Sequence, residues 1–310
     1  MIAQALSTTR GRLISQAPLA PRTWFRVGGK AEWLYQPADS DDLAQTMRAL
    51  PLSVPVTVLG ACSNVIIRDG GIEGLVIRLA QGFSDISLES DGLVVGGACL
   101  DTTIAEQAAQ AGLSGLEFLS GIPGTLGGAV CMNAGAYQAD IATILEWVDI
   151  VTRNGEIIRL NNTDLQFGYR CSNLPQESIV LRARLRGTPA DLSNITARMD
   201  QIRIARKQSQ PLRVRTGGST FRNPDPSCTP LKAWELIDAA GCRGLCYGDA
   251  QINEKHCNFM INLGHATATD LETLGENVRN RVFQHCGINL QWEIKRLGKH
   301  AQNIRGTLHD

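Results

Sequence analysis

Two glycine-rich stretches of this chain contain the residue types that can hold a phosphate group with backbone amides. The first spans residues 59–65 and the second residues 120–129. Closely spaced glycines let the backbone turn sharply and approach a ligand without a Cβ in the way, and successive N–H groups in such turns suit a pyrophosphate. Neither G-x-G-x-x-G nor G-x-x-x-x-G-K-S/T occurs in the chain, so a Rossmann fingerprint and a P-loop are unsupported. Taken alone, either stretch is more often a structural turn between strands.

Three further motifs each contain one side chain that could act on a substrate. Arg170 lies in Tyr-Arg-Cys-Ser, Ser219 follows two glycines, and Glu293 alternates with apolar residues. An arginine can engage a carboxylate with two hydrogen bonds and stabilise charge that develops there, and a hydroxyl held in a turn can protonate a carbanion-like centre. From the residues alone, the simpler interpretations are a surface ion pair, a turn-capping serine and a solvated carboxylate.

Six motifs in a fixed order make the chain resemble the UDP-N-acetylenolpyruvoylglucosamine reductase (MurB) family of flavoenzymes. The resemblance runs over most of the chain, through residues 24–29, 121–137, 167–172, 218–224, 254–262 and 292–296. It implies a vanillyl-alcohol-oxidase/PCMH-type FAD-binding fold in two subdomains, followed by a C-terminal α+β substrate domain. Only a short turn separates Arg170 from Leu181, so the chain resembles the shorter subclass, which lacks a tyrosine-bearing insertion.

The resemblance implies that both glycine-rich stretches bind FAD non-covalently. The implied cofactor-binding residues are Arg26, Gly60, Ala61, Cys62, Ser63, Asn64, Gly121, Ile122, Pro123, Gly124, Thr125, Gly127, Gly128, Asn133 and Ala134. Relatives commonly carry another glycine where this chain has Ala61 or Cys62, so these side chains fit if both residues have negative φ. Asn133 is expected on a strand that emerges after the second stretch.

The resemblance also implies an NADPH-dependent reduction in peptidoglycan biosynthesis. The enolpyruvyl group of UDP-N-acetylglucosamine enolpyruvate would receive a hydride through FAD N5 and a proton from Ser219, giving UDP-N-acetylmuramate. Arg170 and Glu293 complete the implied catalytic residues. The implied substrate-binding residues are Tyr169, Lys207, Arg213, Asn223, Lys255 and His256.

Two other functions fit the same motifs. One is a flavin-dependent alcohol or sugar oxidase of the same superfamily, in which a residue such as Cys62 would tether the flavin. The other is a non-catalytic module that binds flavin or a UDP-sugar.

Composition disfavours several classes of binding partner. The 310 residues include 30 Lys and Arg against 30 Asp and Glu, so no net field favours nucleic acid. The sequence lacks an apolar run long enough to cross a membrane and a secretory signal, and we expect a monomer in the cytoplasm. Nine cysteines are scattered without paired spacing. The cluster of Cys242, Cys246, His256 and Cys257 lacks zinc spacing, which favours small buried thiols and no metal.

Periodicity and turn residues predict mixed helices and strands without a regular βα repeat, which favours an α+β fold. Asp101 is expected to cap a helix that runs through Ala109, and Asn154-Gly155 predicts a type I′ hairpin. The other predicted elements are strands at 54–59, 75–79, 92–96, 178–186 and 258–262, a helical connector at 187–210, and helices from Thr229-Pro230 to Gly241 and from Asp270 to Gly287. The strand at 258–262 is expected to bring its polar ends to a cleft. The last helix is expected to place four apolar residues on one face, namely Leu271, Leu274, Val278 and Val282. The expected domains are FAD-binding subdomains at 1–80 and 81–206, a substrate-binding domain at 207–298 and a polar tail at 299–310.

Overall fold

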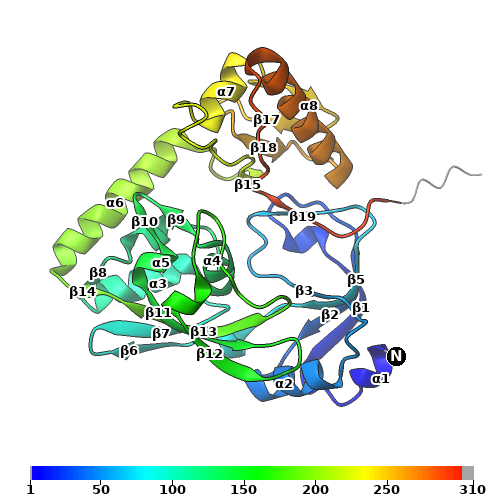
Figure 1. Cartoon of the computed structure of the whole chain (residues 1–310), viewed down its shortest axis with the longest axis vertical. Helices are drawn as coiled ribbons and strands as arrows, with labels where there is room; N and C mark the ends of the chain where they lie inside the picture. Colours follow the sequence, from blue (N-terminus) through cyan, green and yellow to red (C-terminus); the bar gives the residue numbers. More distant parts are fainter. Residues whose placement is uncertain (1, 302–310) are drawn as a thin grey trace, which may run out of the picture. The chain divides into compact units, whose positions relative to one another are not determined.

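The computed structural model (Figure 1) describes residues 2–301. The chain forms two compact units made of interleaved segments. Unit 1 takes the chain up to Ser15, Trp33–Ala61 and Gly74–Gln208, and unit 2 takes Gln16–Glu32, Cys62–Glu73 and the chain from Ser209 onward. Both units combine helices with antiparallel sheets, which confirms the α+β class. Most of the polar tail predicted for 299–310 lies outside the described residues.

The main sheet of unit 1 has five antiparallel strands in the order β12-β11-β13-β7-β6. In β13, Leu181, Ala183 and Leu185 are buried because alternate residues face the core. Arg182 and Arg186, on the opposite side, are exposed, as the alternating sequence predicts. Helices α3 and α4 pack against this sheet (Figure 1). The bounds are β6 Ile86–Glu89, β7 Gly92–Gly96, β11 Leu145–Val151, β12 Ile157–Asn161, β13 Ile179–Arg186, α3 Asp101–Gln110 and α4 Leu126–Met132.

The hairpin predicted at Asn154-Gly155 joins β11 to β12, but the predicted type I′ turn is wrong. A type I′ turn needs positive φ at both central residues, and only Gly155 has one, at 76°. The Gly155 N–H donates to the Thr152 carbonyl at 2.9 Å, and the Thr152 N–H donates to the Glu156 carbonyl at 2.9 Å. This pattern is typical of a longer turn that ends in a left-handed residue and a bulge.

A second sheet has the strand order β1-β2-β5-β3, and three of its strands continue from one unit into the other. Strand β3 pairs with β5 in parallel, so the strands predicted at 54–59 and 75–79 exist with different bounds. The predicted helical connector is α6, which ends before Pro211. The bounds here and in the rest of unit 1 are α1 Ile2–Ala5, β1 Arg12–Pro18, β2 Lys30–Gln36, α2 Ser40–Ala49, β3 Val56–Val58, β5 Ile72–Ile77, β8 Leu113–Ser114, β9 Gly135–Ala136, β10 Ala139–Asp140, α5 Ile141–Ile144, β14 Thr188–Pro189 and α6 Leu192–Ser209.

Unit 2 encloses its core between the four-stranded antiparallel sheet β15-β18-β17-β16 and helices α7 and α8 (Figure 1). Helix α8 buries the four apolar residues predicted to share one face and ends at Gly287, whose φ is 74°. It begins earlier than predicted, because Thr267 is the N-cap and Asp270 completes its capping box. The bounds are β4 Val65–Ile67, β15 Arg215–Ser219, α7 Ala233–Ala239, β16 Cys246–Tyr247, β17 Ala250–Ile252, β18 Phe259–Asn262, α8 Ala268–Cys286 and β19 Lys295–Leu297.

Helix α7 begins later than the sequence predicts. Its N-cap is Lys232, whose N–H donates to the Glu235 carboxylate at 2.7 Å. Thr229, the predicted cap, instead accepts the Leu231 N–H at its hydroxyl, at 3.2 Å. The Thr-Pro signal therefore forms a local turn before the helix, and Gly241 closes the helix as predicted, with φ at 66°.

Candidate active site

The second glycine-rich stretch lies in unit 1, between a short 3-10 helix, Glu117–Gly121, and the start of α4. It is tied to the segment that follows β7: the Asp101 N–H donates to the Gly124 carbonyl at 3.2 Å, and the Leu126 N–H to the Cys99 carbonyl at 2.9 Å. A Cβ on Gly124 would lie 2.5 Å from Asp101 Oδ2. This close packing explains why the turn needs glycine there.

The first stretch meets the second within unit 1. A Cβ on Gly60 would lie 2.5 Å from Thr125 Oγ1. Gly60 and Thr125 are 65 positions apart in the sequence, yet the Gly60 backbone packs against the Thr125 side chain. Such a glycine-lined approach suits a ligand held by backbone amides.

Replacing Gly60 by alanine is therefore expected to strain the contact with Thr125 by about 1–3 kcal/mol, the usual cost of inserting a methyl into a filled space. Since the resemblance implies that both stretches bind FAD, the strain should weaken FAD binding. The Thr125 side chain is short and branched at Cβ, so it cannot move aside easily. Fluorescence titration of apoprotein with FAD would measure the effect. The control is Gly264→Ala in unit 2, where a Cβ would have its nearest neighbour at 3.9 Å. Equal affinities in both variants would contradict this role for Gly60.

Asn133 holds the turn that carries Arg170. The strand expected at Asn133 is absent. Asn133 instead forms the C-cap of α4, with φ at 42°. Its Nδ2 donates to the Gly168 carbonyl at 3.1 Å, and its Oδ1 accepts the Ala142 N–H at 3.0 Å. Gly168 and Cys171 form an isolated antiparallel bridge that leaves Tyr169 and Arg170 at the tip of a tight turn. The Asn133 amide thus forms hydrogen bonds to the protein backbone.

Arg170 occupies a left-handed backbone conformation at the tip of this turn, with φ at 59°. Its Nη2 donates to the Gly135 carbonyl at 2.9 Å, and its guanidinium lies 5.4 Å from the ring centre of Tyr169. A non-glycine residue in this conformation is uncommon and frequently belongs to a functional site. Arg26, Cys62, Asn133 and Arg213 share a positive φ.

Ser219 and Glu293 lie on neighbouring segments of unit 2. Ser219 ends β15 opposite Phe259, after an irregularity in the ladder that includes Gly218 with φ at 77°. The predicted turn around Ser219 is therefore a bulge in a strand, a feature that re-aims side chains. The next residue, Thr220, accepts the Glu293 N–H at its carbonyl, at 2.9 Å. Ser219 and Glu293 are 74 positions apart in the sequence, and the antiparallel bridge between Phe221 and Trp292 brings their segments together.

The segment that carries Glu293 is fixed on both sides. Asn64 Nδ2 donates to the Glu293 carbonyl at 3.3 Å, and the Lys295 N–H donates to the Asn64 carbonyl at 3.1 Å. Strand β19 then continues in parallel with β4. The end of the first glycine-rich stretch, in its unit 2 part, thus positions the Glu293 backbone.

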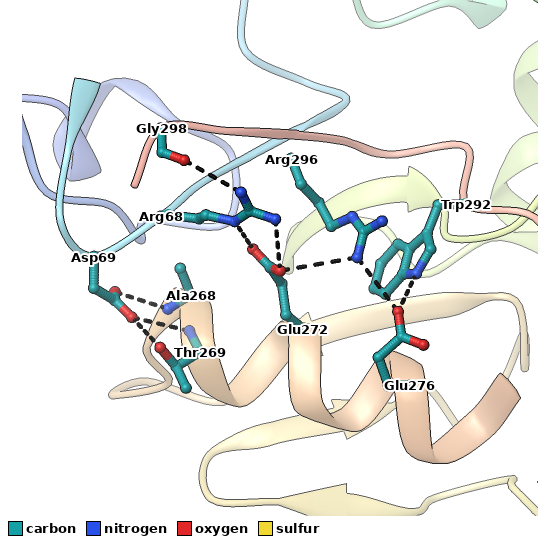
Figure 2. Close-up of polar contacts among 9 residues, drawn as sticks. All are labelled: Arg68, Asp69, Ala268, Thr269, Glu272, Glu276, Trp292, Arg296 and Gly298. Carbon is teal, nitrogen blue, oxygen red and sulfur yellow. Dashed lines mark hydrogen bonds and ion pairs between the residues drawn. The ribbon is translucent and has the colours of Figure 1, made fainter. Parts of the chain in front are cut away.

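Side chains of helix α8 contact side chains of the same segment (Figure 2). Trp292 Nε1 donates to Glu276 Oε1 at 2.8 Å, and the Arg296 guanidinium lies 4.6 Å from the Trp292 ring centre. Glu272 pairs with Arg68 at 2.8 Å, and the Asp69 carboxylate accepts the first N–H groups of the helix (Figure 2). A carboxylate at that helix end is favourable, because the N–H groups there have no partner within the helix.

Gly275 of α8 provides the surface on which the Trp292 indole rests. A Cβ at Gly275 would overlap the indole far inside van der Waals contact. We expect Gly275→Ala to destabilise the protein by about 1–3 kcal/mol through overpacking, despite a gain in helix propensity of about 1 kcal/mol. Urea unfolding would measure it, with Asn280→Ala on the exposed side of α8 as control. A Gly275→Ala protein at least as stable as wild type would refute the packing argument.

Cys62 lies in unit 2, where its carbonyl accepts the Trp24 N–H at 3.2 Å. The expected fit of Ala61 and Cys62 required negative φ at both positions, and Cys62 fails this condition with φ at 54°. The backbone of this buried cysteine therefore adopts a conformation that is easier for glycine.

The expected substrate-binding residues are distributed over both units. Tyr169 and Lys207 are exposed in unit 1, and Arg213 and Lys255 are exposed in unit 2. Asn223 accepts the Ala233 N–H at the start of α7, at 3.1 Å. His256 lies between Trp234 and Phe259, and its Nδ1 accepts the Asn258 N–H at 3.2 Å. Burial lowers the His256 pKa, so the imidazole favours its neutral form.

The strand expected at 258–262 was predicted to bring its polar ends to a cleft, and this is wrong. Asn258 and Asn262 are both buried. The Asn258 side chain accepts the Phe221 N–H and donates to the Phe221 carbonyl, and Asn262 Nδ2 donates to the Phe25 carbonyl at 2.8 Å. These amides satisfy irregular backbone, which is what buried polar groups require.

Asp101 is a residue whose role sequence reasoning missed. It was expected to cap α3, but Leu100 is the N-cap and Asp101 is the first helical residue. Its side chain is completely buried, and among the described residues neither carboxylate oxygen has a hydrogen-bond partner. Burial raises its pKa to about 8. No local pattern signals this, since an aspartate at a helix start is typical of a cap.

The nine cysteines all lie in the described part of the chain and form no disulfide. Cys242 and Cys257 are buried, as predicted, whereas Cys246 is exposed. Within residues 2–301, no group of three or more His, Cys, Asp or Glu side chains is placed to hold a metal ion. None of the helices in the same residues is both long and apolar enough to cross a bilayer.

Comparison with known proteins gives matches over the length of the chain. A model described as "FAD binding domain" matches residues 31–161, and one described as "UDP-N-acetylenolpyruvoylglucosamine reductase, C-terminal domain" matches residues 210–297. The UDP-N-acetylenolpyruvoylglucosamine reductase of Gluconobacter oxydans is 61% identical over 293 residues, 94% of each chain. That of Granulibacter bethesdensis is 58% identical over 289 residues, 93% of this chain and 92% of that protein.

A solved structure gives the same result. The crystal structure of UDP-N-acetylenolpyruvylglucosamine reductase (MurB) from Thermus caldophilus is 37% identical, with a TM-score of 0.78, and covers 92% of this chain and 99% of that one. These matches confirm the resemblance carried by the six motifs and the FAD-binding fold with a distinct C-terminal domain.

Proposed function

This chain belongs to the UDP-N-acetylenolpyruvoylglucosamine reductase family, and from that membership we propose the reaction it catalyses. The substrate is UDP-N-acetylglucosamine enolpyruvate, the reductant is NADPH, and the product is UDP-N-acetylmuramate for peptidoglycan. The observation that carries this proposal is identity of 61% over 94% of the chain with a reductase of that name.

The residues present fit FAD. Glycine at 60 lets the first stretch pack against Thr125 of the second, and glycine at 124 leaves room for the Asp101 carboxyl. Both stretches lie within residues 31–161, which the model described as "FAD binding domain" matches. Bound FAD supplies the relay by which a hydride equivalent from NADPH reaches the enolpyruvyl double bond. Backbone amides of the two stretches would hold its diphosphate, together with Arg26, Ser63 and Asn64.

Three side chains have distinct proposed roles. The Arg170 guanidinium engages the carboxylate of the enolpyruvyl group and stabilises negative charge that develops there. Ser219 Oγ gives its proton to the α-carbon, which completes the saturation of the double bond, and regains a proton from solvent. Glu293 accepts a hydrogen bond near the same carboxylate or relays that proton.

The remaining assignments follow from the family as proposals. Tyr169, Lys207, Arg213, Asn223, Lys255 and His256 bind the UDP-sugar. The enzyme acts as a monomer in the cytoplasm, without nucleic acid or membrane partners. The division at residues 80 and 206 is proposed as a functional one, since the compact units of the fold are two and interleaved.

The decisive experiment is an absorption spectrum of the purified protein, followed by titration with UDP-N-acetylglucosamine enolpyruvate. We expect a flavin spectrum that the substrate perturbs, rapid bleaching by NADPH, and reoxidation when substrate is added. A colourless protein that does not take up FAD at micromolar concentrations would refute the proposal.

Two outcomes would favour the other functions. Flavin that stays with the acid-precipitated pellet would indicate covalent tethering, as in an oxidase, and Cys62 would be the first residue to test. Flavin that NADPH does not bleach rapidly would indicate a binding module.

A further inference from the structure

A carboxyl group lies directly behind the second glycine-rich stretch without a partner of its own. Asp101 is 0% exposed, and both of its carboxylate oxygens lack hydrogen-bond partners among the described residues. Its N–H donates to the Gly124 carbonyl at 3.2 Å, and Leu100 forms an antiparallel bridge with Thr125. Oδ2 occupies the space that a Cβ on Gly124 would need.

The described elements packed around Asp101 place no cation beside it. Burial alone raises the pKa of the Asp101 carboxyl. On α3 itself, Glu106 is exposed and pairs with Arg203 at 3.4 Å, and on the neighbouring 3-10 helix the Glu117 carboxylate accepts the Ser114 hydroxyl at 2.7 Å. The adjacent Cys99 thiol is buried, and burial together with Asp101 raises its pKa to about 11. A buried carboxylate without partners is strongly disfavoured, so the group takes up a proton instead.

We infer that Asp101 is a positioning residue for FAD: in its neutral form it supports the turn at Gly124, and losing its proton loosens the cofactor. This inference rests on the proposed function. An ionised carboxylate here needs water or movement to be solvated, and both disturb the turn it touches. It also places a negative charge behind the backbone proposed to hold a diphosphate, which repels that ligand.

The expected result is a one-proton dependence of FAD affinity on pH. The Asp101 pKa of about 8 sets the window. If the ionised form binds poorly, the FAD dissociation constant of the wild-type apoprotein rises about tenfold between pH 7 and pH 9. Asp101→Asn keeps the shape of the neutral side chain and cannot ionise, so its affinity at pH 6 stays near that of wild type and changes less than twofold to pH 9.

Fluorescence titration of apoprotein with FAD from pH 6 to pH 9 would measure this for wild type, Asp101→Asn and Glu106→Gln. Glu106→Gln removes a carboxylate from the exposed side of the same helix and should titrate like wild type. A wild-type affinity that is flat in pH, or the same rise in Asp101→Asn, would overturn the inference. Wild-type protein that fails to bind FAD at pH 6 would instead refute the proposed function.

Thermal unfolding of the apoprotein gives a second measurement without FAD. Burial raises the Asp101 pKa from its ordinary value of 3.8 to about 8. Between about pH 4 and pH 8 the folded protein therefore binds more protons than the unfolded chain. Its contribution to stability is therefore full below that window and is lost as pH rises through it. Asp101→Asn should remove this loss. An Asn variant that unfolds at every pH would contradict a neutral side chain in the native state.

Discussion

Replacing Ser219 by alanine is expected to slow reoxidation of the bound flavin by the enolpyruvyl substrate by about 10²–10⁴-fold, the usual contribution of a positioned proton donor. Reduction of the flavin by NADPH should stay nearly intact, because that half-reaction does not need a proton at the substrate carbon. The bulge that carries Ser219 is held by backbone pairing with Phe259, so removing one hydroxyl should leave the site in place. Stopped-flow absorbance separates the two half-reactions.

Two variants make this result specific. Ser219→Cys keeps a proton donor at the same position and should recover part of the lost rate. Ser227→Ala, at an exposed serine of the same unit that bonds to Asp225, should leave both half-reactions unchanged. Equal losses in reduction and reoxidation for Ser219→Ala would point to a defect in folding or cofactor binding, and would remove Ser219 as the proton donor.

Arg170→Ala should slow the same half-reaction by about 10²–10³-fold, the range seen when one group that stabilises developing charge is removed. Arg170→Lys should recover only part of this, because an ammonium group lacks the planar pair of donors that matches a carboxylate. Lysine and arginine have similar strain at φ of 59°, so this comparison isolates the guanidinium. Single-turnover reoxidation at saturating substrate is the measurement.

The matched control for Arg170 is Arg186→Lys, an exposed arginine of unit 1 at the end of β13. It should behave as wild type in both half-reactions. Unaltered single-turnover rates in Arg170→Ala would exclude Arg170 from the reaction, and the Gly135 carbonyl that it binds at 2.9 Å would then define a structural role.

Local sequence patterns predicted the elements that depend on local interactions. The apolar face of α8 and the alternation in β13 follow from the periods of the helix and the strand, so both were readable before the structure. The hairpin at Gly155 was readable for the same reason, although its turn type was wrong. Boundaries were less certain, as at α7, because several residues before Ala233 also offer side chains that can bond to backbone.

The candidate site was predicted by residue type and motif order, and its internal contacts were not. Asn133 and Asn262 read as ligand-facing amides, yet both bind irregular backbone inside their own units. The difference arises because a buried backbone group must find a partner wherever the chain turns irregularly. The sequence shows that an amide side chain is present, but it does not show which backbone group will lack another hydrogen-bond partner.

The sequence by itself determined the family, the proposed cofactor and the residue types of the reaction, because six motifs in one order are specific when taken together. Only the tertiary structure decided that Gly60 meets Thr125, that Ser219 neighbours Glu293, and that the Asp101 carboxyl is buried. Each of these joins or encloses residues through packing across long stretches of chain. Local propensity does not encode such contacts, since burial is set by everything that packs around a residue.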